Sequence, residues 1–444
     1  MAISPAREAA FDILLRIERQ DAYASELLHS SQYTRLSAAD HGLATELVMG
    51  VLRWRSVLDG QVAPYSSQRL EKLDAEVLTA LRLAAYQLSF LDRIPERAAV
   101  HESVELVKRS RKRSAVPFAN AVLRKLSHAA GGRDAPPVIR TETIAQLSQS
   151  AAHPLWLVER WAGQFGQEAA KRICEYDQSV PATSVRMASP SVEKELLQEN
   201  VVLTPGRMLA SARRVQTGDI TQTRAFREGR VSIQDEASQL TALLVGHAST
   251  ILDCCAAPGG KTRILASENP HAMLVAVELH PHRARLLRKL VPDSNVQVIA
   301  ADVRQFPVGR SFMRVLVDVP CSGTGTLARN PEIKWRLTPA DLWDLQSRQL
   351  AILQSAIEQV AAGGRLIYST CSLEPEENAA VVEKALGLDS SLRVIDCYGE
   401  LERLRAQGDL VWQDLKSLTM GQYLRTLPGL HPSDGFFAAV LEKN

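Results

Sequence analysis

Cysteine is scarce in this sequence, with six in 444 residues, and none of the six forms a Cys-x-x-Cys pair or lies at a matching distance from histidine. Structural zinc sites are usually built from such pairs, so the spacing predicts no metal site. Few cysteines without a disulfide-like pattern are typical of a reducing compartment, and we expect a cytoplasmic protein.

Long hydrophobic runs are also missing. Ala237–Leu252 is the longest uncharged stretch that leans apolar, but Ser, Gln, Thr, Gly and His interrupt it. It is too short and too polar to span a bilayer. The first residues carry Glu8, Asp12 and Glu18 within an amphipathic pattern, unlike a signal or transit peptide. We therefore expect no membrane association, and the length favours two or three globular domains.

Acidic residues are absent from Val107–Lys125, which holds seven Lys and Arg. A second basic cluster contains Arg207, Arg213, Arg214, Arg224, Arg227 and Arg230. Either cluster alone is more often a solvated face. Residues 1–140 hold 20 basic and 16 acidic residues, whereas residues 231–444 hold 21 and 24. Basic clusters before an acidic C-terminal part indicate that the protein holds a polyanion.

Four ranges differ in their residue patterns. Residues 1–130 show helical periodicity without strand-like alternation, which predicts an all-helical domain. Residues 131–154 open with the helix-breaking GGRDAPP and are interpreted as a linker. Residues 155–235 mix a helix with short β-like runs and turns, which predicts a small α+β subdomain.

Residues 236–444 repeat a strand–loop–helix pattern with near-continuous apolar strands, which predicts an α/β domain with a parallel sheet covered on both faces. The predicted strands are TILDCC, MLVAVE, VQVIA, MRVLVDVP and GRLIYST. Ligands bind such sheets beyond the carboxyl ends of the strands, where this sequence places acids, glycines and cysteines. This recurrence predicts a functional site at that edge.

The first strand leads into the loop Cys255–Lys261, CAAPGGK. A phosphate-binding loop would need glycine at Cys255, and a dinucleotide fingerprint would need Gly-x-Gly-x-x-Gly, so neither pattern matches. Gly259 and Gly260 let backbone amides approach a ligand. Glu278 could bind ribose hydroxyls and Asp302 an adenine amine, so the series favours S-adenosylmethionine over isolated surface acids.

Two cysteines follow later strands: Cys321 in DVPCSGTG and Cys371 in YSTCSLEPEEN. Each could be an inert small side chain in a turn, which is the usual role of a lone cysteine. A helix predicted to start at Pro375 would favour a Cys371 thiolate through its dipole. The side chains of Glu374, Glu376 and Glu377 would offset some of that effect if they lie close. Two such thiols on one sheet edge make a chemical role the better interpretation. His280 and His282 lack a third metal ligand and are interpreted as a solvated loop.

The motifs DCCAAPGGKT, DVPCSGTG, NPEIKW and YSTCSLEPEEN, in this order, resemble those of the RNA cytosine-5 methyltransferases. Over its whole length the chain resembles the RsmB (Sun/Fmu) type, which methylates 16S ribosomal RNA of the small subunit. The resemblance implies a NusB-like helical RNA-binding domain, a small RNA-binding subdomain and a Rossmann-like domain that uses S-adenosylmethionine. Glu278 stands where aspartate is common and Val319 where alanine is common.

The resemblance also implies residue roles. Cys371 would add to carbon 6 of cytosine, Cys321 would assist elimination, Asp318 would bind the pyrimidine, and Lys261 would orient Asp318 or the ligand. The implied cofactor-binding residues are Cys255, Ala256, Ala257, Pro258, Gly259, Gly260, Lys261, Glu278, Asp302 and Asp318.

Several alternatives stay open at this point. The two cysteine roles could be reversed, because DNA cytosine-5 methyltransferases place their nucleophile after a proline. The substrate could be transfer RNA, since relatives with the same motifs modify it. The chain could also be a non-catalytic RNA-binding or antitermination-type factor, although the intact cysteines and glycines favour an enzyme. Nothing in the sequence requires more than a monomer.

Overall fold

The computed structural model describes residues 3–20, 22–30, 32–33, 35–130, 138–305 and 311–444. Their contacts divide the chain into two compact units. The helical unit comprises Met1–Val180 and Leu327–Arg336, and the sheet unit comprises Pro181–Thr326 and Leu337–Asn444. The helix-breaking residues 131–137 of the predicted linker lie outside the described residues.

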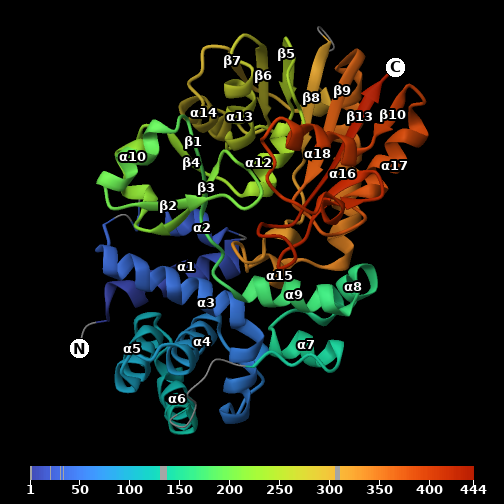
Figure 1. The fold of residues 1–444 in the computed structure, drawn as a ribbon. Coiled ribbons are helices and arrows are strands. Elements are labelled where there is room, and N and C mark those ends of the chain that lie inside the picture. Colours follow the sequence, from blue (N-terminus) through green and yellow to red (C-terminus); the bar gives the residue numbers. More distant parts are fainter. Residues whose placement is uncertain (1–2, 21, 31, 34, 131–137, 306–310) are drawn as a thin grey trace. The chain divides into compact units, whose positions relative to one another are not determined.

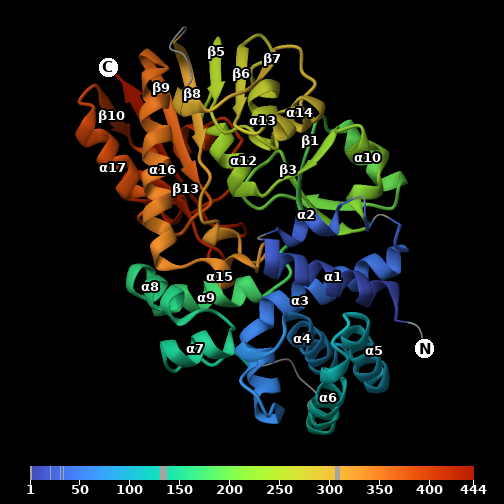
Figure 2. The same cartoon turned by 180° about the vertical axis from the view of Figure 1, so that it is seen from behind.

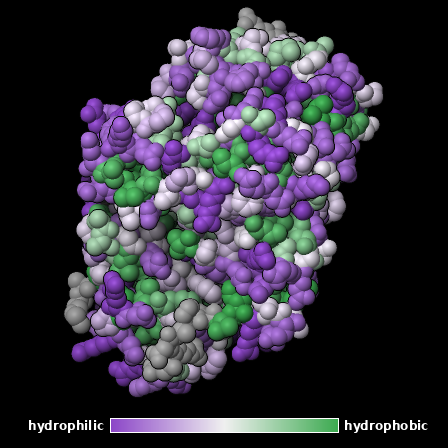
Figure 3. Space-filling view, in the orientation of Figure 1, coloured by the Kyte–Doolittle hydropathy of each residue, from purple (hydrophilic) through white to green (hydrophobic). Residues whose placement is uncertain are grey.

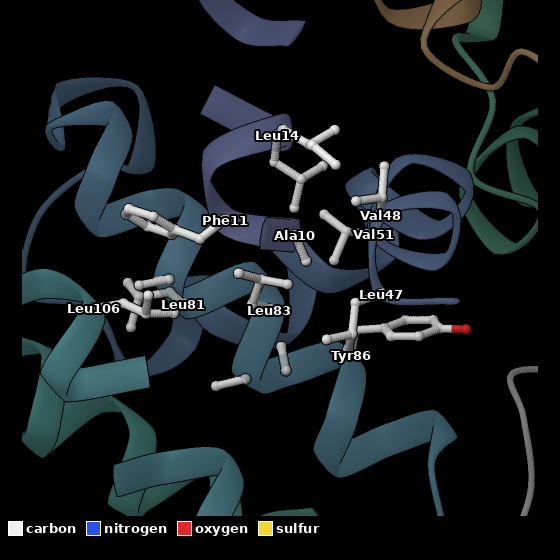
Figure 4. Packing of buried hydrophobic residues seen from close by; sticks show 14 of the residues in the cluster. Ala10, Phe11, Leu14, Leu47, Val48, Val51, Leu81, Leu83, Tyr86 and Leu106 are labelled. Carbon is white, nitrogen blue, oxygen red and sulfur yellow. The ribbon is translucent and has the colours of Figure 1, made fainter. Parts of the chain in front are cut away.

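The helical unit is built from amphipathic helices around one apolar core, as the periodicity predicts. Figure 4 shows this core, where Phe11, Leu47, Leu81 and Leu106 from four different helices pack together. Ser37 caps the longest helix by accepting a hydrogen bond from the Asp40 amide at 3.1 Å. The helices are α1 Pro5–Gln20, α2 Ala24–Leu28, α3 Ala38–Val62, α4 Ala75–Phe90, α5 Glu96–Arg109, α6 Val116–Ala130, α7 Ile144–Ser150, α8 Leu155–Phe165, α9 Gln167–Gln178 and α15 Ile333–Arg336.

Leu327–Arg336, which contains the NPEIKW motif, joins the helical unit although it lies between two segments of the sheet unit. The Trp335 Nε1 donates to the Leu52 carbonyl at 2.6 Å, and the Lys334 Nζ donates to the Arg53 carbonyl at 3.0 Å. Lys334 is buried, and this desolvation lowers its pKa to about 7. The chain therefore leaves the sheet unit six residues after Cys321 and returns at Leu337.

The sheet unit begins with a small antiparallel sheet, in the strand order β2-β3-β1-β4. Its strands are β1 Ser184–Met187, β2 Val202–Pro205, β3 Ala212–Thr217 and β4 Val231–Ile233, with helices α10 Ser191–Gln198 and α11 Arg224–Arg227. Val185, Leu196 and Ile220 form its core. The range 155–235 thus contains α8 and α9, which belong to the helical unit, and this small sheet, which belongs to the sheet unit.

The larger sheet joins nine of the described strands in the order β11-β12-β13-β9-β8-β5-β6-β7, with β10 paired to β13. Their bounds are β5 Thr250–Asp253, β6 Met273–Glu278, β7 Val296–Ala300, β8 Phe312–Asp318, β9 Val360–Thr370, β10 Leu392–Ile395, β11 Thr419–Met420, β12 Tyr423–Thr426 and β13 Phe436–Lys443. Strands β5 to β9 are parallel, which confirms the prediction. The antiparallel β10–β13 were not predicted.

Alternate residues of each parallel strand face opposite layers of helices, as the pleat requires. Ile251, Leu274 and Leu316 pack with helices α12 Glu236–Leu243, α13 Gly260–Glu268, α14 Pro281–Leu290 and α18 Cys397–Ala406. Their neighbours Leu252, Val275 and Val317 pack with α16 Pro339–Glu358 and α17 Ala379–Leu388. In Figure 1 the layer of α12, α13, α14 and α18 lies in front of the sheet. In Figure 2, which shows the opposite side, α16 and α17 lie in front of it.

Among the described residues, no helix combines the length and apolar character needed to cross a membrane. On the face drawn in Figure 3, hydrophobic residues form small patches separated by hydrophilic ones.

Candidate active site

The carboxyl ends of the parallel strands β5 to β9 meet at one edge of the sheet. Strand β5 is the point where the order reverses, with β6 and β7 on one side and β8 and β9 on the other. Ligands bind at such switch points in open α/β sheets. A cavity of about 620 Å³ opens there. Of the predicted site residues, it is lined by Cys255, Ala257, Glu278, Asp302, Asp318, Cys321 and Cys371.

Cys321 and Cys371 come together at this cavity, with their Sγ atoms 3.2 Å apart. The Gly325 amide donates to the Cys371 carbonyl at 2.9 Å, which joins the two loops through their backbones. The hydrogen bond with Cys371 and burial raise the pKa of the Cys321 thiol. Either sulfur could donate the hydrogen bond that the pair shares.

Asp318 is the last residue of β8, and each of its two carboxylate oxygens accepts a hydrogen bond. The Lys261 Nζ lies 2.6 Å from Oδ2, and the Ser369 hydroxyl donates to Oδ1 at 2.7 Å. The Lys261 ammonium also lies 5.1 Å from the centre of the Phe436 ring. Lys261 does not line the cavity itself, so its contact with Asp318 favours the orienting role over direct ligand binding.

The loop after β5 needs glycine at residue 259 for its own conformation. Gly259 has a φ of +115° and precedes α13. A Cβ there would lie 2.7 Å from a Leu287 methyl group and 2.8 Å from one of Val291. Of the predicted cofactor-binding residues in this loop, the cavity is lined by Cys255 and Ala257 but not by Ala256, Pro258, Gly259, Gly260 or Lys261.

The two remaining acids differ in their surroundings. Glu278 is buried, and its Oε1 accepts from the His280 amide at 2.9 Å. Asp302 is bound through both oxygens by the Arg304 guanidinium, at 2.6 to 3.1 Å. This hydrogen bonding from Arg304 lowers the pKa of Asp302. Both carboxylates line the cavity as acceptors.

These residues fit a nucleoside ligand such as S-adenosylmethionine. The contacts of Glu278 with described residues go to Oε1, so its Oε2 is available to ribose hydroxyls. Three apolar side chains also line the cavity, where an adenine ring could pack: Val303, Leu345 and Ile352. Metal binding has no comparable support, because no three His, Cys, Asp or Glu side chains gather suitably in the described part of the chain.

One prediction about Cys371 is wrong. The helix after β9 begins at Ala379, not at Pro375, because residues 375–378 form turns. Cys371 therefore does not lie in front of a helix N-terminus, and the dipole argument for its thiolate fails. Glu377, expected only to offset that dipole, instead accepts hydrogen bonds from both Ser322 and Ser372.

Sequence reasoning missed the contribution of α16 to the cavity, through Leu345, Arg348 and Ile352. The helical periodicity of 339–358 predicts an amphipathic helix, but it does not say which residues face the ends of the strands. His280, interpreted as a solvated loop residue, also lines the cavity.

The second basic cluster is largely neutralised by acids of its own unit. Arg213, Arg214, Arg224 and Arg230 form ion pairs with Glu193, Glu236, Glu228 and Glu195 respectively. Within Val107–Lys125, by contrast, Arg111, Arg113, Arg124 and Lys125 are exposed and take part in none of the ion pairs between described residues.

Known proteins resemble both parts of the chain. The sequence-family model described as 16S rRNA methyltransferase RsmB/F matches residues 240–442, and the sequence-family model of the NusB family matches residues 4–128. A probable ribosomal RNA small subunit methyltransferase B of Bacillus subtilis is 32% identical over 454 residues, covering 98% of each chain. The ribosomal RNA small subunit methyltransferase B of Vibrio cholerae is 31% identical, covering 98% of this chain and 97% of its own.

Solved structures share the fold. PH0851 matches with a TM-score of 0.80 at 22% identity, covering 100% of both chains. NSun6 from Pyrococcus horikoshii with SFG matches with a TM-score of 0.56 at 19% identity, covering 65% of this chain and 98% of that one.

Proposed function

The chain belongs to the RsmB/F family of 16S rRNA methyltransferases and is an RNA methyltransferase, and we propose that it methylates carbon 5 of a cytosine in 16S rRNA through a covalent cysteine adduct. One observation carries this proposal: the Sγ atoms of Cys321 and Cys371 lie 3.2 Å apart in a cavity that Asp318 also lines. A reaction that needs one thiol to attack and a second group to remove a proton fits this pair.

Carbon 5 of cytosine is a poor nucleophile, and addition of a thiolate to carbon 6 makes it nucleophilic. Cys371 adds to carbon 6 while Asp318, held by Lys261 and Ser369, accepts from the exocyclic amine. As negative charge moves from the Cys371 sulfur into the ring, Cys321 gives its proton to ring nitrogen 3. S-adenosylmethionine supplies the methyl group when it is bound.

Cys321, now a thiolate, then removes the proton from carbon 5. The carbon 6–sulfur bond breaks, Cys371 leaves as a thiolate, and the proton on nitrogen 3 passes to solvent. The net change is a methyl group gained and a proton lost. The raised pKa of Cys321, caused by its hydrogen bond to Cys371 and by burial, supports a proton on that sulfur at the start.

The cavity supports S-adenosylmethionine as the cofactor. Glu278 would hold the ribose and Asp302 the adenine amine, with Val303 and Ile352 against the ring. Cys255 and Ala257 contribute the wall after β5. NSun6 from Pyrococcus horikoshii, which shares this fold, was solved with the S-adenosylmethionine analogue SFG.

Two cysteine variants test the roles of the thiols. We expect Cys371→Ala to lose both methylation and covalent RNA capture, because no nucleophile remains. Cys321→Ala should still capture RNA, because solvent can protonate ring nitrogen 3 instead. The adduct should be long-lived, because no thiolate remains to remove the proton from carbon 5. The measurement is denaturing electrophoresis of protein with labelled 16S rRNA and S-adenosylmethionine. Capture by Cys371→Ala together with loss of capture by Cys321→Ala would show the reversed roles.

Bisulfite sequencing of RNA from a deletion strain tests the substrate. One cytosine of 16S rRNA should lose its protection in the deletion strain and regain it with wild-type protein but not with Cys371→Ala. Loss of protection in transfer RNA instead would replace the rRNA assignment. Unchanged protection in both RNAs would contradict cytosine-5 methylation by this chain.

A further inference from the structure

Glu377 is a buried carboxylate without a cationic partner among the described residues, and four neutral donors surround it. Its Oε1 accepts from the Ser322 amide and from the Gln349 Nε2, each at 2.8 Å. Its Oε2 accepts from the Ser372 hydroxyl at 2.5 Å and from the Ser322 hydroxyl. Burying a charge is costly, and here neutral hydrogen bonds alone offset the cost.

Three of the four donors belong to the two cysteine loops. Ser322 directly follows Cys321, and Ser372 directly follows Cys371. Gln349 of α16 reaches the same region, because its Nε2 also donates to the carbonyl of Pro320 at 3.0 Å. One carboxylate thus binds the residue after each cysteine, and its neighbour Gln349 binds the residue before Cys321.

The directions of the hydrogen bonds are mutually consistent. The Ser372 hydroxyl donates to Glu377 and accepts from the Glu374 amide at 3.0 Å. The Thr324 hydroxyl accepts from the Leu373 amide at 2.9 Å. The Ser322 and Ser372 hydroxyls therefore both point their protons toward the carboxylate, which acts as an acceptor through both oxygens.

We infer that Glu377 is a positioning residue that fixes the loops of Cys321 and Cys371 relative to each other, so that the Cys371 sulfur faces carbon 6 and the Cys321 sulfur carbon 5 of the same cytosine. The inference rests on the proposed function, in which Cys371 attacks and Cys321 takes the proton. The charge of Glu377 adds to this role, because it contributes, after the Cys371 hydrogen bond and burial, to the raised pKa of Cys321.

Glu377→Gln is the informative variant because it preserves size but turns one acceptor into a donor. The new NH2 group would face either the Ser322 amide and Gln349 or the two serine hydroxyls. The hydrogen bond from the Gly325 amide to the Cys371 carbonyl remains in this variant, so the two loops stay joined at one point. We expect the separation of the sulfurs to increase and to fluctuate more.

The sulfur separation can be tested without methyl transfer, on the full-length protein. Diamide oxidises two thiols to a disulfide while its nitrogen–nitrogen double bond is reduced to the hydrazine. We expect the Cys321–Cys371 disulfide, identified by peptide mass mapping, to form about tenfold more slowly in Glu377→Gln than in wild type. This factor is of the order expected for removal of one hydrogen bond to a charged group.

Glu236→Gln is the matched control. Glu236 is also a buried carboxylate of the sheet unit, but it accepts from the amides of Met208 and Leu209 and pairs with Arg214, none of which belongs to a cysteine loop. We expect it to lower the melting temperature without changing the disulfide rate. Equal disulfide rates in wild type and folded Glu377→Gln would overturn the inference.

Single-hydroxyl variants cover the case in which Glu377→Gln does not fold. Ser322→Ala and Ser372→Ala each remove one hydroxyl hydrogen bond to Glu377 and should slow disulfide formation by a smaller factor, whereas unchanged rates in both would refute the role.

RNA capture tests the link to catalysis: a larger fraction of the RNA should be bound as the covalent adduct by Glu377→Gln than by wild type. If neither wild type nor Cys321→Ala captures RNA, the proposed function fails, whereas the disulfide rates still decide whether Glu377 sets the sulfur distance.

Discussion

Asp253 ends strand β5 with its carboxyl group buried between the sheet and α13. The Thr262 hydroxyl donates to its Oδ2 at 2.8 Å. Burial raises the pKa of Asp253 to about 7, against the opposing effect of the Thr262 hydrogen bond. Sequence reasoning assigned Asp253 no role. It is the first residue of DCCAAPGGKT, and nothing in the residue pattern distinguishes a buried acid at a strand end from the acids at the ends of neighbouring strands that face solvent.

This raised pKa predicts a pH-dependent stability. Since the folded pKa lies above the unfolded value of 3.8, the contribution of Asp253 is complete below pH 3.8 and is lost as the pH rises through about 7. The loss amounts to on the order of 4 kcal/mol at about 1.4 kcal/mol per pKa unit. The side chain introduced by Asp253→Asn cannot ionise, so the melting temperature of the variant should rise relative to that of wild type between pH 5 and pH 8. Calorimetry at both pH values measures this, and a constant difference would contradict it.

At the same scale, the sequence identified seven of the nineteen residues that line the cavity, among them its three acids. Asp318, Cys321 and Cys371 are recognisable because each follows a predicted parallel strand, and parallel strands bring their carboxyl ends to one edge. Glu377 was noticed only as a charge, since its partners Ser322 and Gln349 lie 55 and 28 residues away. Local patterns do not encode such pairings.

At the scale of elements, the loop after β8 depends on close backbone packing against the turn before β13. The Gly435 amide donates to the Gly325 carbonyl at 2.8 Å. A Cβ on Gly325 would lie 2.3 Å from the Gly435 carbonyl oxygen and 2.7 Å from its carbon. These are backbone atoms, which cannot rotate away as a flexible side chain can.

Gly325→Ala should therefore displace the loop that carries Cys321. We expect destabilisation by about 1–3 kcal/mol, the usual cost of overpacking, together with slower release of captured RNA. Gly387→Ala in α17 is the control, because its Cβ would meet no atom within 4 Å; it should leave stability unchanged or slightly higher. Urea unfolding of both variants measures the difference, and equal losses of stability would contradict the argument.

The elements themselves were predictable to different degrees. Strands β6 and β7 occupy the ranges predicted for MLVAVE and VQVIA, because continuous apolar runs between turn residues are strong strand signals. The start of α17 was misplaced by four residues, since Pro375 in YSTCSLEPEEN suits a turn as well as a first helical turn.

For the whole molecule, the predicted fold class is confirmed: a NusB-like helical part precedes a Rossmann-like methyltransferase part. The two basic clusters differ in a way that charge counting could not show. Four arginines of the second cluster are paired with glutamates, whereas Arg111, Arg113, Arg124 and Lys125 of the first are exposed and outside the ion pairs of the described residues.

RNA affinity should therefore depend mainly on the first cluster. Replacing Arg111, Arg113, Arg124 and Lys125 by Gln should weaken binding and flatten its salt dependence, by about 0.7 in the log–log slope for each phosphate that the protein no longer neutralises. Arg224→Gln with Arg230→Gln should change both much less, because those guanidinium groups are already paired. Fluorescence anisotropy across a salt series measures the slopes, and a larger effect of the second pair would reverse the assignment.

The sequence by itself determined the order of the motifs, the alternation of strands and helices, and the sheet edge that carries the cysteines. The hydrophobic period and the right-handed geometry of parallel units are local properties. Only the tertiary structure decided that the sulfurs lie 3.2 Å apart, that Glu377 joins their loops, and that Leu327–Arg336 belongs to the helical unit. Those arrangements follow from packing between residues tens to hundreds of positions apart, which no single stretch of sequence encodes.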